Sequence, residues 1–375
     1  MNVLVVTNDF PPRVGGIQTY VHEIFTRLDD DITVVASTSP GAATFDRTFR
    51  HRVVRLPTSM LLPTPRTLRR VAALARSIHP DVIVFGASMP LALMGPSLHQ
   101  RLGVPYVAFT HGLEVAASRV PLWRTALAYS LRRAAAVTAV SSWTADVLRH
   151  SVGDGRVRVL PNGVDTTRFH VGVRDADIRA RHGLDDALVV GCVSRLVPRK
   201  GQDVLLAACA HLTSAVPNLR VLIVGSGPDL GRLQAIARRL GMADRVVFAG
   251  EVTEAELPMY FRAADIFAMP CRSRWAALEV EAFGAVYLQA AAVGRPVIAG
   301  RSGGTSDALR NGETGILVDA SRTEEVVDAL RHLLQDRTAA AAMGDRGAEW
   351  ARSRCGWDQV AADARRLFLD AAAKA

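Results

Sequence analysis

The stretch LVVGCVSRLVPRKGQDVLL (residues 188–206) decides the fold class of this chain. It begins with a β-branched run of strand length, passes through a turn flanked by Arg195 and Lys200, and continues as an apolar segment that predicts a helix. A strand that leads through a tight turn into a helix is half of a βαβ unit. Repeated units of this kind predict a parallel sheet with helices on both faces. The predicted fold class is therefore α/β.

The strand-and-helix alternation occurs in two successive sets along the 375 residues. Strand-length segments are predicted at 3–6, 33–37, 82–86, 106–110 and 137–140, and again at 188–195, 220–227, 245–250, 265–270 and 295–300. Amphipathic stretches such as 66–78 and 142–150 lie between them. Ten strands and 375 residues are more than one domain with a single hydrophobic core usually contains, so we predict two doubly wound, Rossmann-like domains.

The domain boundary is predicted in LPNGVDTTRF (160–169), where Pro, Asn and Gly interrupt the pattern. We expect an N-terminal domain over 1–165 and a C-terminal domain over 166–355. A last segment, 356–375, carries a helix near 357–371 that is expected to pack back on the first domain. Ligands of open α/β sheets bind at the carboxyl ends of the strands, so a cleft lined by these ends is the expected site.

Composition narrows the class of protein. Hydrophobic residues make up 49% and charged residues 22%, which is typical of a globular protein. The four cysteines show no metal-ligand spacing and are interpreted as core residues in a reducing cytosol. No run of 18 apolar residues is present, and the opening MNVLVVTNDF is interpreted as a first strand and not a signal peptide. A cytoplasmic location is expected.

The net charge of +9 is unevenly distributed. Residues 1–165 hold 18 arginines against 11 acidic residues, a net charge of +7, and the rest of the chain holds +2. A basic first half indicates an anionic partner such as phospholipid or phosphate. Nucleic acid is not expected, because no basic tract interleaved with aromatic residues accompanies the charge.

A glycine pair follows the first predicted strand, in PPRVGGIQTY (11–20). Gly15 and Gly16 would let a ligand approach the backbone closely, and the free N–H groups at a helix start attract anions. The alternative is a tight turn with no ligand. Two weaker glycine motifs follow later strands: GSGPDL (225–230), which begins with Gly225, and SGGTSDAL (302–309).

Arg195 and Lys200 in SRLVPRKGQDVLL (194–206) are suited to grip a diphosphate between two cations. The chain contains 45 basic residues, but lysine occurs only at Lys200 and Lys374. A chain that otherwise uses arginine has thus kept one lysine outside its tail, which favours a need for a compact point charge. A solvated surface charge is the alternative.

Two further motifs carry polar side chains after predicted strands. In ALEVEAFGAVYLQAAAVGRPVIAG (277–300), Glu281 is predicted to precede a helix whose first turn holds Phe283 and Gly284, with Gln289 on roughly the same face. In THGLEV (110–115), His111 would hydrogen-bond a sugar hydroxyl or assist a transition state. A favourable helix-dipole contact for Glu281 and a structural role for His111 are the alternatives.

These motifs together resemble the retaining GT-B glycosyltransferases of family four. The resemblance lies in GG-x-x-x-Y, THG, VSSWT (140–144), PNGVD (161–165), SRLVPRKG, and E-x7-Q before GRPVIAG, and it spans the chain. Within the family the chain resembles the actinobacterial phosphatidylinositol mannosyltransferases that add a second mannose. The stretches that carry this likeness are VTNDFPPRVGGIQ (6–18), MLLPTP (60–65), FGASMPLALM (85–94), SRLVPRKGQD (194–203) and DIFAMPCRSR (265–274).

The resemblance implies a role for each matching residue. Gly16, with Gly15 and Gly225, would contact the donor, His111 would lie beneath the transferred sugar, and Arg195 with Lys200 would neutralise the leaving diphosphate. Glu281 would bind sugar hydroxyls, helped by backbone N–H groups at Phe283 and Gly284. The acceptor side would comprise Arg13, Gln18, Leu113, Glu114 and Trp275. No metal cofactor is implied, because the two cations supply the charge. The implied donor is GDP-mannose and the implied acceptor is a phosphatidylinositol mannoside.

The sequence departs from the family pattern at four places. The second acidic residue, which accepts the ribose hydroxyls, is Gln289 here, so one charge-assisted acceptor is lost. The usual HGHE has Leu113 in its third place, the EG pair reads Glu281–Ala282, and a glycine-rich stretch reads Trp275–Ala276–Ala277. Two alternatives therefore stay open: another donor with a natural-product acceptor, and a non-catalytic descendant. A sugar-nucleotide epimerase is a third alternative, but the SRLVPRKG and PNGVD motifs argue against it.

The segment 66–78, RTLRRVAALARSI, predicts contact with an anionic membrane. Leu68, Val71, Leu74 and Ile78 form one helical face, and Arg66, Arg69, Arg70 and Arg76 lie off it. A basic surface of this kind would hold the protein at the inner face of the plasma membrane as a peripheral protein. A solvated helix face is the alternative.

Overall fold

The computed structural model describes residues 1–118, 120–275 and 278–373, and the predicted segments fall almost wholly within them. Two compact units are present. Met1–Asn162 and Trp357–Ala375 form the first unit, and Gly163–Gly356 forms the second. The first unit is thus assembled from both ends of the chain. Ala276 and Ala277, part of the bulky stretch after Trp275, lie outside the described residues.

The first unit is built on a seven-stranded parallel sheet in the order β3-β2-β1-β4-β5-β6-β7. Its strands are β1 (Asn2–Thr7), β2 (Asp31–Ser37), β3 (Arg52–Leu56), β4 (Val82–Phe85), β5 (Tyr106–Thr110), β6 (Ala136–Ala139) and β7 (Val157–Val159). The five predicted strands are present. The sequence analysis missed the edge strands β3 and β7, because their partly exposed, arginine-containing segments lack a continuous apolar run.

Helices cover both faces of this sheet. They are α1 (Gly16–Thr26), α2 (Ala42–Thr48), α3 (Pro65–Ile78), α4 (Gly95–Leu102), α5 (Leu113–Ala117), α6 (Pro121–Leu131), α7 (Ser142–Val152) and α15 (Trp357–Ala372), with short 3-10 turns at Leu91–Met94 and Asp154–Arg156. The helices α3, α4, α6 and α7 share one hydrophobic core with alternate residues of the strands. On the other face, α1 packs against α15.

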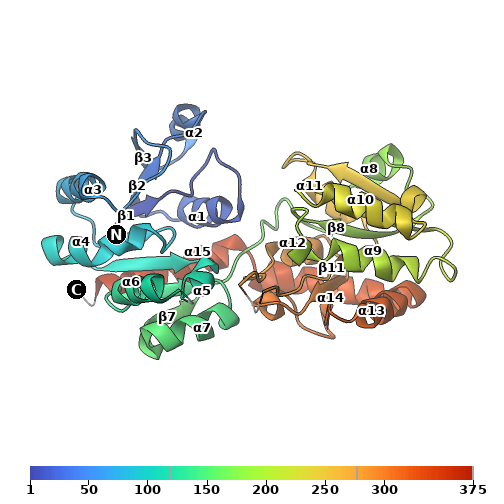
Figure 1. Cartoon of the computed structure of the whole chain (residues 1–375). Helices are drawn as coiled ribbons and strands as arrows, with labels where there is room; N and C mark the ends of the chain where they lie inside the picture. Colours follow the sequence, from blue (N-terminus) through green and yellow to red (C-terminus); the bar gives the residue numbers. More distant parts are fainter. Residues whose placement is uncertain (119, 276–277, 374–375) are drawn as a thin grey trace. The chain divides into compact units, whose positions relative to one another are not determined.

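The C-terminal helix α15 lies beside the strands of the first unit, although it is far in sequence from the rest of that unit (Figure 1). The ring of Phe368 stacks on Phe25 of α1 at 5.9 Å between centroids and on Phe109 of β5 at 6.1 Å. Arg365 also donates to the buried carboxylate of Asp30 at 2.7 Å. Burial of three phenylalanines stabilises this packing through the hydrophobic effect and ring contacts.

The second unit has a six-stranded parallel sheet in the order β10-β9-β8-β11-β12-β13. Its strands are β8 (Leu188–Val193), β9 (Leu219–Val224), β10 (Val246–Gly250), β11 (Ile266–Met269), β12 (Val297–Gly300) and β13 (Gly315–Val318). The five predicted strands are again present. The short β13, whose middle residues are only half-buried, was missed.

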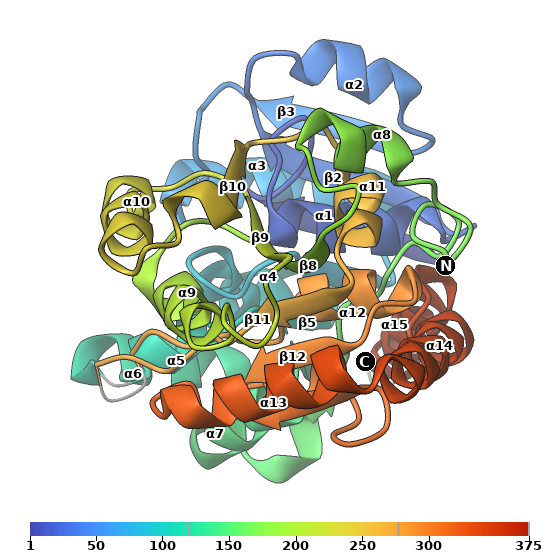
Figure 2. The same cartoon turned by 90° about the vertical axis from the view of Figure 1, so that its right-hand side faces the viewer.

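The helices of the second unit are α8 (Ala176–Arg181), α9 (Gln202–Ala210), α10 (Leu230–Arg239), α11 (Leu257–Ala263), α12 (Ala285–Ala292), α13 (Thr323–Gln335) and α14 (Arg337–Arg354). Short 3-10 turns occur at Pro198–Lys200, Ala243–Arg245 and Thr305–Ala308. The helices α9 and α13 pack side by side (Figure 2), and α12 packs against α14. The predicted α/β fold class with two doubly wound sheets is confirmed.

The amphipathic helix α3 has the predicted faces. Val71 is buried, and Leu68, Leu74 and Ile78 pack against the core of the first unit. Arg66, Arg69, Arg70 and Arg76 are exposed. The apolar face is therefore occupied by the protein itself, and only the basic face is available to a partner. No helix in the described part of the chain is both long and apolar enough to cross a bilayer.

Strand order reverses at one point in each sheet, which fixes where ligands bind. In the first sheet, β1 lies between β2 and β4, and in the second, β8 lies between β9 and β11. Chain connections leave β1 and β4, or β8 and β11, in opposite directions, so a crevice opens at their carboxyl ends. The residues after these strands are the candidates for function.

Candidate functional site

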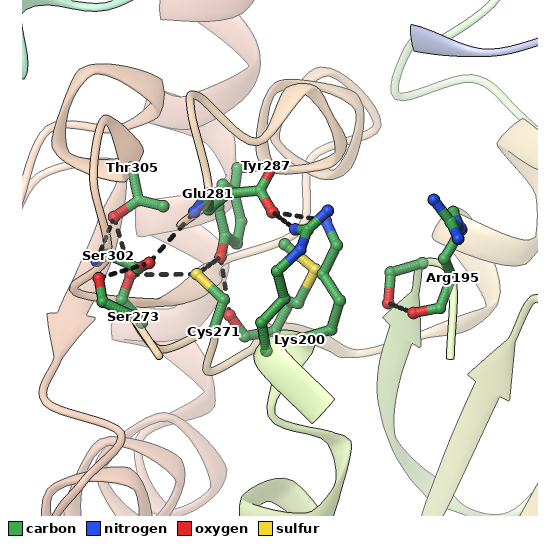
Figure 3. Close-up of polar contacts among 12 residues, drawn as sticks. Arg195, Lys200, Cys271, Ser273, Glu281, Tyr287, Ser302 and Thr305 are labelled. Carbon is green, nitrogen blue, oxygen red and sulfur yellow. Dashed lines mark hydrogen bonds and ion pairs between the residues drawn. The ribbon is translucent and has the colours of Figure 1, made fainter. Parts of the chain in front are cut away.

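A cluster of one carboxylate and two cations lies at the switch point of the second unit (Figure 3). The Nζ atom of Lys200 donates to Oε2 of Glu281 at 2.6 Å, and Nη1 of Arg199 donates to the same oxygen at 2.9 Å. The side chains of Lys200 and Glu281 are only 11% and 13% exposed. Lys200 and Glu281 were predicted from the sequence, but Arg199 was not. Its position directly before Lys200 in the same turn was the available signal.

The turn that carries the two cations is pressed against the end of β11. Gly201, which follows Lys200, has a φ of +77°, and a Cβ atom there would lie 1.9 Å from the carbonyl oxygen of Pro270. Only glycine fits this approach. The backbone N–H of Arg272 donates to the carbonyl of Arg199 at 2.9 Å, and its guanidinium binds Asp203 through two hydrogen bonds of 3.0 and 2.7 Å. These contacts hold the turn that carries Lys200 against the segment after β11.

Glu281 is held by the loop that follows β12. Its N–H donates to Oγ of Ser302 at 3.2 Å, and its carbonyl accepts from the N–H of Gly304 at 3.0 Å. A Cβ atom on Gly303, whose φ is +54°, would lie 2.5 Å from the same carbonyl. The predicted SGGT motif thus has a structural role as the platform for Glu281. Ser302 in turn contacts Ser273 and Thr305 (Figure 3).

The helix after Glu281 begins later than the sequence indicated. α12 starts at Ala285, so Phe283 and Gly284 precede its first turn, and Glu281 lies in a loop. The expectation that Glu281 and Gln289 share one helical face was therefore wrong. Gly284, with a φ of +91°, makes the turn, because a side chain there would collide with the ring of Tyr287. Gln289 lies half-buried in the second turn of α12, and its side-chain amide forms no hydrogen bond within the described part of the chain.

The charges of the cluster set the protonation of Glu281. Burial alone would raise the pKa of this carboxyl, but Lys200 and Arg199 together outweigh that effect and lower it. Glu281 is therefore an anion at neutral pH, and the three side chains carry a net charge of +1. Two cations that share a single carboxylate oxygen retain donor capacity toward a second anion. The thiol of Cys271 close by is inert, because burial raises its pKa to about 12.

Arg195 does not join this cluster. Its side chain is exposed and forms no hydrogen bond or ion pair with any residue that the structure describes, and Figure 3 shows it apart from Lys200. Its backbone is fixed, since the amide of the buried Gln202 donates to the carbonyl of Arg195 at 3.1 Å. Gly225 lies against the same segment, where a Cβ atom would be 2.1 Å from the carbonyl of Ser194. Close backbone packing thus accounts for Gly225.

A second cluster lies in the first unit, on the loop after β5. The carboxylate of Glu114 is 2% exposed and accepts three hydrogen bonds: from the N–H groups of His111 and Gly112 at 3.1 and 3.0 Å, and from Oγ of Ser88 at 2.5 Å. Glu114 was predicted to lie on the acceptor side. The structure places it beneath the His111–Gly112 turn, where it caps backbone donors that would otherwise be buried without partners.

His111 is held as a neutral ring. Burial lowers its pKa, and the nearby charges of Glu114 and Asp9 only partly oppose that effect. Its Nε2 lies 2.8 Å from the carbonyl oxygen of Gly86. A carbonyl only accepts, so this bond assigns the proton to Nε2 and leaves Nδ1 as an acceptor. The ring also packs edge-on against Tyr20 at 5.1 Å between centroids.

Asp9 is a further candidate that the sequence analysis missed. It lies two residues after the end of β1, and its carboxylate accepts from Nε2 of Gln18 at 2.9 Å. Burial raises its pKa, against the opposing charges of His111 and Arg13. A carboxyl with a raised pKa at a sheet switch point is typical of a functional site. The signal available in the sequence was its position immediately after the first strand, in VTNDF.

The other predicted residues of the first unit lie in the loop after Asp9 and in the first turn of α1. α1 begins at Gly16, and a Cβ atom there would meet no described atom within 4 Å. Local packing therefore does not require glycine at this position. At Gly15 a Cβ atom would collide with the side chain of Gln18. Arg13 is exposed and donates to the carbonyl of Ser59 at 2.9 Å.

Two of the departures from the family pattern lie on the surface. Leu113 is 67% exposed at the start of α5, and Trp275 is 66% exposed. Trp275 has a φ of +50°, a left-handed conformation that costs a non-glycine residue roughly 1–2 kcal/mol. The backbone thus keeps a glycine-like turn although the residue is tryptophan. Arg274 stacks over its ring at 5.1 Å.

Two protein families match this chain. Residues 174–350 match the family described as glycosyl transferases group 1, and residues 14–168 match glycosyltransferase family 4. The GDP-mannose-dependent alpha-(1-6)-phosphatidylinositol monomannoside mannosyltransferase of Mycolicibacterium smegmatis is 44% identical over 365 residues, 95% of each chain. The GDP-mannose-dependent monoacylated alpha-(1-6)-phosphatidylinositol monomannoside mannosyltransferase of Corynebacterium glutamicum is 38% identical over 95% of this chain and 94% of its own length.

Solved structures share the fold at lower sequence identity. Anabaena Alr3699/HepE in complex with UDP superposes with a TM-score of 0.84 at 20% identity and covers 98% of this chain and 99% of its own. The sucrose-phosphate synthase of Thermosynechococcus elongatus superposes with a TM-score of 0.81 at 23% identity over the full length of both chains. Full-length relatives and the fold agree: this chain belongs to the family 4, group 1 glycosyltransferases of GT-B architecture.

Proposed function

We propose that this protein transfers mannose from GDP-mannose to the 6-position of a phosphatidylinositol mannoside, with retention of configuration. The observation that carries the proposal is the Lys200–Glu281–Arg199 cluster at the switch point of the second unit. Support for the donor and acceptor comes from full-length relatives, which are named for this reaction and are 38–44% identical to the chain.

The second unit would bind the donor. Lys200 and Arg199 already share one carboxylate oxygen, and the exposed Arg195 has no anionic partner among the described residues. A diphosphate offers acceptor oxygens to all three cations. Glu281 would then turn its carboxylate to the hydroxyls of the sugar, next to the N–H groups of Phe283 and Gly284. Preorganised cations of this kind stabilise charge that develops on a leaving group.

The reaction needs no protein nucleophile. The bond between the anomeric carbon and the diphosphate oxygen breaks, and the electron pair stays on the diphosphate, where Lys200, Arg195 and Arg199 neutralise it. The acceptor hydroxyl attacks the same face of the sugar and passes its proton to a leaving phosphate oxygen. Configuration is retained because bond breaking and bond formation occur on one face. The electrostatic role of a metal is filled by the side chains.

The first unit would bind the acceptor. Asp9 and Gln18 are hydrogen-bonded to each other, and Nδ1 of the neutral His111 is an acceptor for a hydroxyl proton. A polyol is recognised by neutral donors and acceptors of this type. At Gly16 the helix start is open to an approaching phosphate oxygen, because no local packing explains the glycine.

Two departures bear on specificity within this proposal. Gln289 offers an amide oxygen to a ribose diol where the family pattern has a carboxylate, which weakens nucleotide binding by about 1–2 kcal/mol. Leu113 removes a polar group beside His111 and presents an exposed apolar side chain instead. Both leave the cationic cluster intact, so transfer itself is expected to persist.

A direct transfer assay tests the proposed function. Purified protein is incubated with GDP-, UDP- or ADP-linked sugars and with either a phosphatidylinositol monomannoside or a water-soluble mannoside, and products are resolved by mass spectrometry and NMR. The expected result is an α-linked mannose from GDP-mannose on the lipid acceptor. Preference for another nucleotide sugar would support the alternative with a different donor. The absence of both transfer and donor hydrolysis would contradict an enzymatic role.

A further inference from the structure

A groove with a volume of about 900 Å³ lies between α6 and α7 in the first unit. It is lined by Arg124 and Ala128 of α6 and by Arg132 at the C-cap of that helix, spaced one helical turn apart, and by Asp146, Val147 and His150 of α7. The two helices pack against each other, so the groove lies within one helix layer of the first unit. None of these residues belongs to the two clusters described above.

The groove is basic. Arg124, Arg132 and Arg133 line it, and Asp146 is the one carboxylate among its lining residues. Asp146 is already paired with Arg149 at 2.7 Å. Arg124 has no hydrogen-bonding partner for its guanidinium within the described residues, while Arg132 donates to the carbonyl of Ser151, which leaves its charge uncompensated. The groove is therefore complementary to an anion.

Large apolar side chains stand exposed beside this basic groove. Leu122 is 75% exposed, Val120 47% and Trp123 46%, all at the start of α6 and directly before Arg124. Leu113, 67% exposed, begins α5, which packs against α6. Such a group of exposed apolar residues on a globular unit marks a surface that is covered in function. Tryptophan beside arginine is typical of the boundary between lipid and water.

We propose that the start of α6 and the groove between α6 and α7 form the surface that docks this protein on an anionic phospholipid bilayer. Leu122 and Trp123 enter the acyl boundary, and Arg124, Arg132 and Arg133 contact lipid phosphates. The inference rests on the proposed function in one respect: an acceptor with acyl chains lies in a bilayer.

Two observations favour a bilayer over other anionic partners. A free phosphate would use the arginines but would not account for exposed Leu122 and Trp123. Single-stranded nucleic acid binds by stacking bases on aromatic faces, and the guanidinium of Arg133 already lies 3.9 Å from the ring centre of Tyr129. Continuity with the candidate site adds support, since α5 links the His111 turn to α6.

The basic face of α3, which the sequence indicated as a membrane surface, differs in one respect. The apolar residues of the helix itself are packed against the core, and the exposed Met60 and Leu62 lie in the segment before the helix, beside Arg66 and Arg70. On the α6 surface, the exposed Leu122 and Trp123 stand on the same helix as Arg124. A comparison of the two surfaces therefore tests the proposal.

Vesicle co-sedimentation of the full-length protein, with no donor or acceptor present, measures docking alone. Vesicles of phosphatidylcholine with 30% phosphatidylglycerol are compared with pure phosphatidylcholine, each at low and high salt. Binding is expected only to the anionic vesicles and should weaken with salt. The double variant Leu122→Ser, Trp123→Ser is expected to bind at least tenfold more weakly, whereas Leu369→Ser, another exposed apolar position in the same unit, should bind like wild type.

Charge variants separate the two basic surfaces. Arg124→Gln with Arg133→Gln should weaken binding about 30-fold, because each arginine near an anionic surface contributes roughly a factor of five. The matched pair on α3, Arg66→Gln with Arg70→Gln, should weaken it far less. Circular dichroism checks that each variant is folded. Greater loss from the α3 pair, equal binding to both vesicle types, no binding at all, or preferred binding to an oligonucleotide would overturn the proposal.

Activity measured on a water-soluble mannoside distinguishes a failure of membrane docking from a failure of the proposed transfer reaction. The docking variants should turn over that acceptor like wild type and lose activity only with acceptor embedded in vesicles. Loss on both acceptors would overturn a docking role. Absence of transfer in wild type, with vesicle binding intact, would instead contradict the proposed function and leave the docking surface supported.

Discussion

The two candidate clusters both lie in loops that follow strands of similar parallel sheets, yet they are built from opposite kinds of interaction. In the second unit, Lys200 and Arg199 bind Glu281 through charged hydrogen bonds of 2.6 and 2.9 Å. In the first unit, the carboxylate of Glu114 accepts hydrogen bonds from backbone N–H groups and from Ser88, and His111 is kept neutral by burial. One cluster presents spare positive charge, and the other presents uncharged donors and acceptors.

This difference matches the two substrates proposed for the enzyme. A nucleoside diphosphate carries charge that increases as it leaves, and fixed cations stabilise it most effectively. A sugar hydroxyl carries none, and a neutral imidazole beside a partly buried carboxyl is suited to orient it. Each of the following changes should affect one cluster without the other.

Replacement of Lys200 by Ala should have the largest effect. We expect kcat/KM for mannose transfer to fall about 1,000-fold, because a preorganised charge at the leaving group is lost. The fold should survive, since Arg199 still pairs with Glu281. Transfer rates and melting temperature are measured together, with Arg238→Ala on exposed α10 as the control. Turnover near the wild-type rate would remove Lys200 from the mechanism.

Replacement of Glu114 by Ala should chiefly affect stability. Two backbone N–H groups and the hydroxyl of Ser88 would lose a buried acceptor, which costs about 3 kcal/mol of unfolding free energy. Glu114→Gln retains one acceptor oxygen, and the hydroxyl of Ser88 can turn to accept from the new amide, so a smaller loss is expected. Urea unfolding provides the measurement. Equal losses in the two variants would refute the capping role.

Replacement of Gln289 by Glu should strengthen the donor side alone. A carboxylate accepts hydrogen bonds from a ribose diol better than an amide, so GDP should bind about tenfold more tightly. Isothermal calorimetry compares this variant with Gln335→Glu, which adds the same charge at an exposed position on α13. If the affinity for GDP rises equally in both variants, net charge and not a specific contact is responsible. If it does not rise in Gln289→Glu, the ribose is bound elsewhere.

The smallest expected effect concerns the neutral cluster of the first unit, where His111 should change how the free energy of unfolding depends on pH. Burial lowers the pKa of His111 from its ordinary 6.5. Below that value the unfolded chain binds a proton that the folded protein excludes, so stability falls as the pH falls toward the lowered pKa. Between pH 7 and 6, wild type should lose about 0.7 kcal/mol more than His111→Gln. Identical slopes in the two proteins would contradict a neutral, buried His111.

The sequence predicts much of the fold because buried parallel strands carry long β-branched runs. β3, β7 and β13 were missed for the same reason, since edge or half-buried strands lack such runs. At the site, the sequence named residues that follow strands, and the structure brings two of them, Lys200 and Glu281, into contact. Arg199 and Asp9 were missed because their importance depends on packing: Arg199 matters through its contact with Glu281, and Asp9 through its burial. The start of α12 was misplaced because the turn at Gly284 depends on Tyr287.

The central claim is that Lys200 and its neighbours bind the donor diphosphate. Titration of wild type and Lys200→Ala with GDP and with guanosine isolates this contribution, because the two ligands differ only in the diphosphate. Wild type should bind GDP at least 100-fold more tightly than guanosine, and Lys200→Ala should lose most of that ratio while its affinity for guanosine stays unchanged. A ratio that survives the substitution would contradict the account.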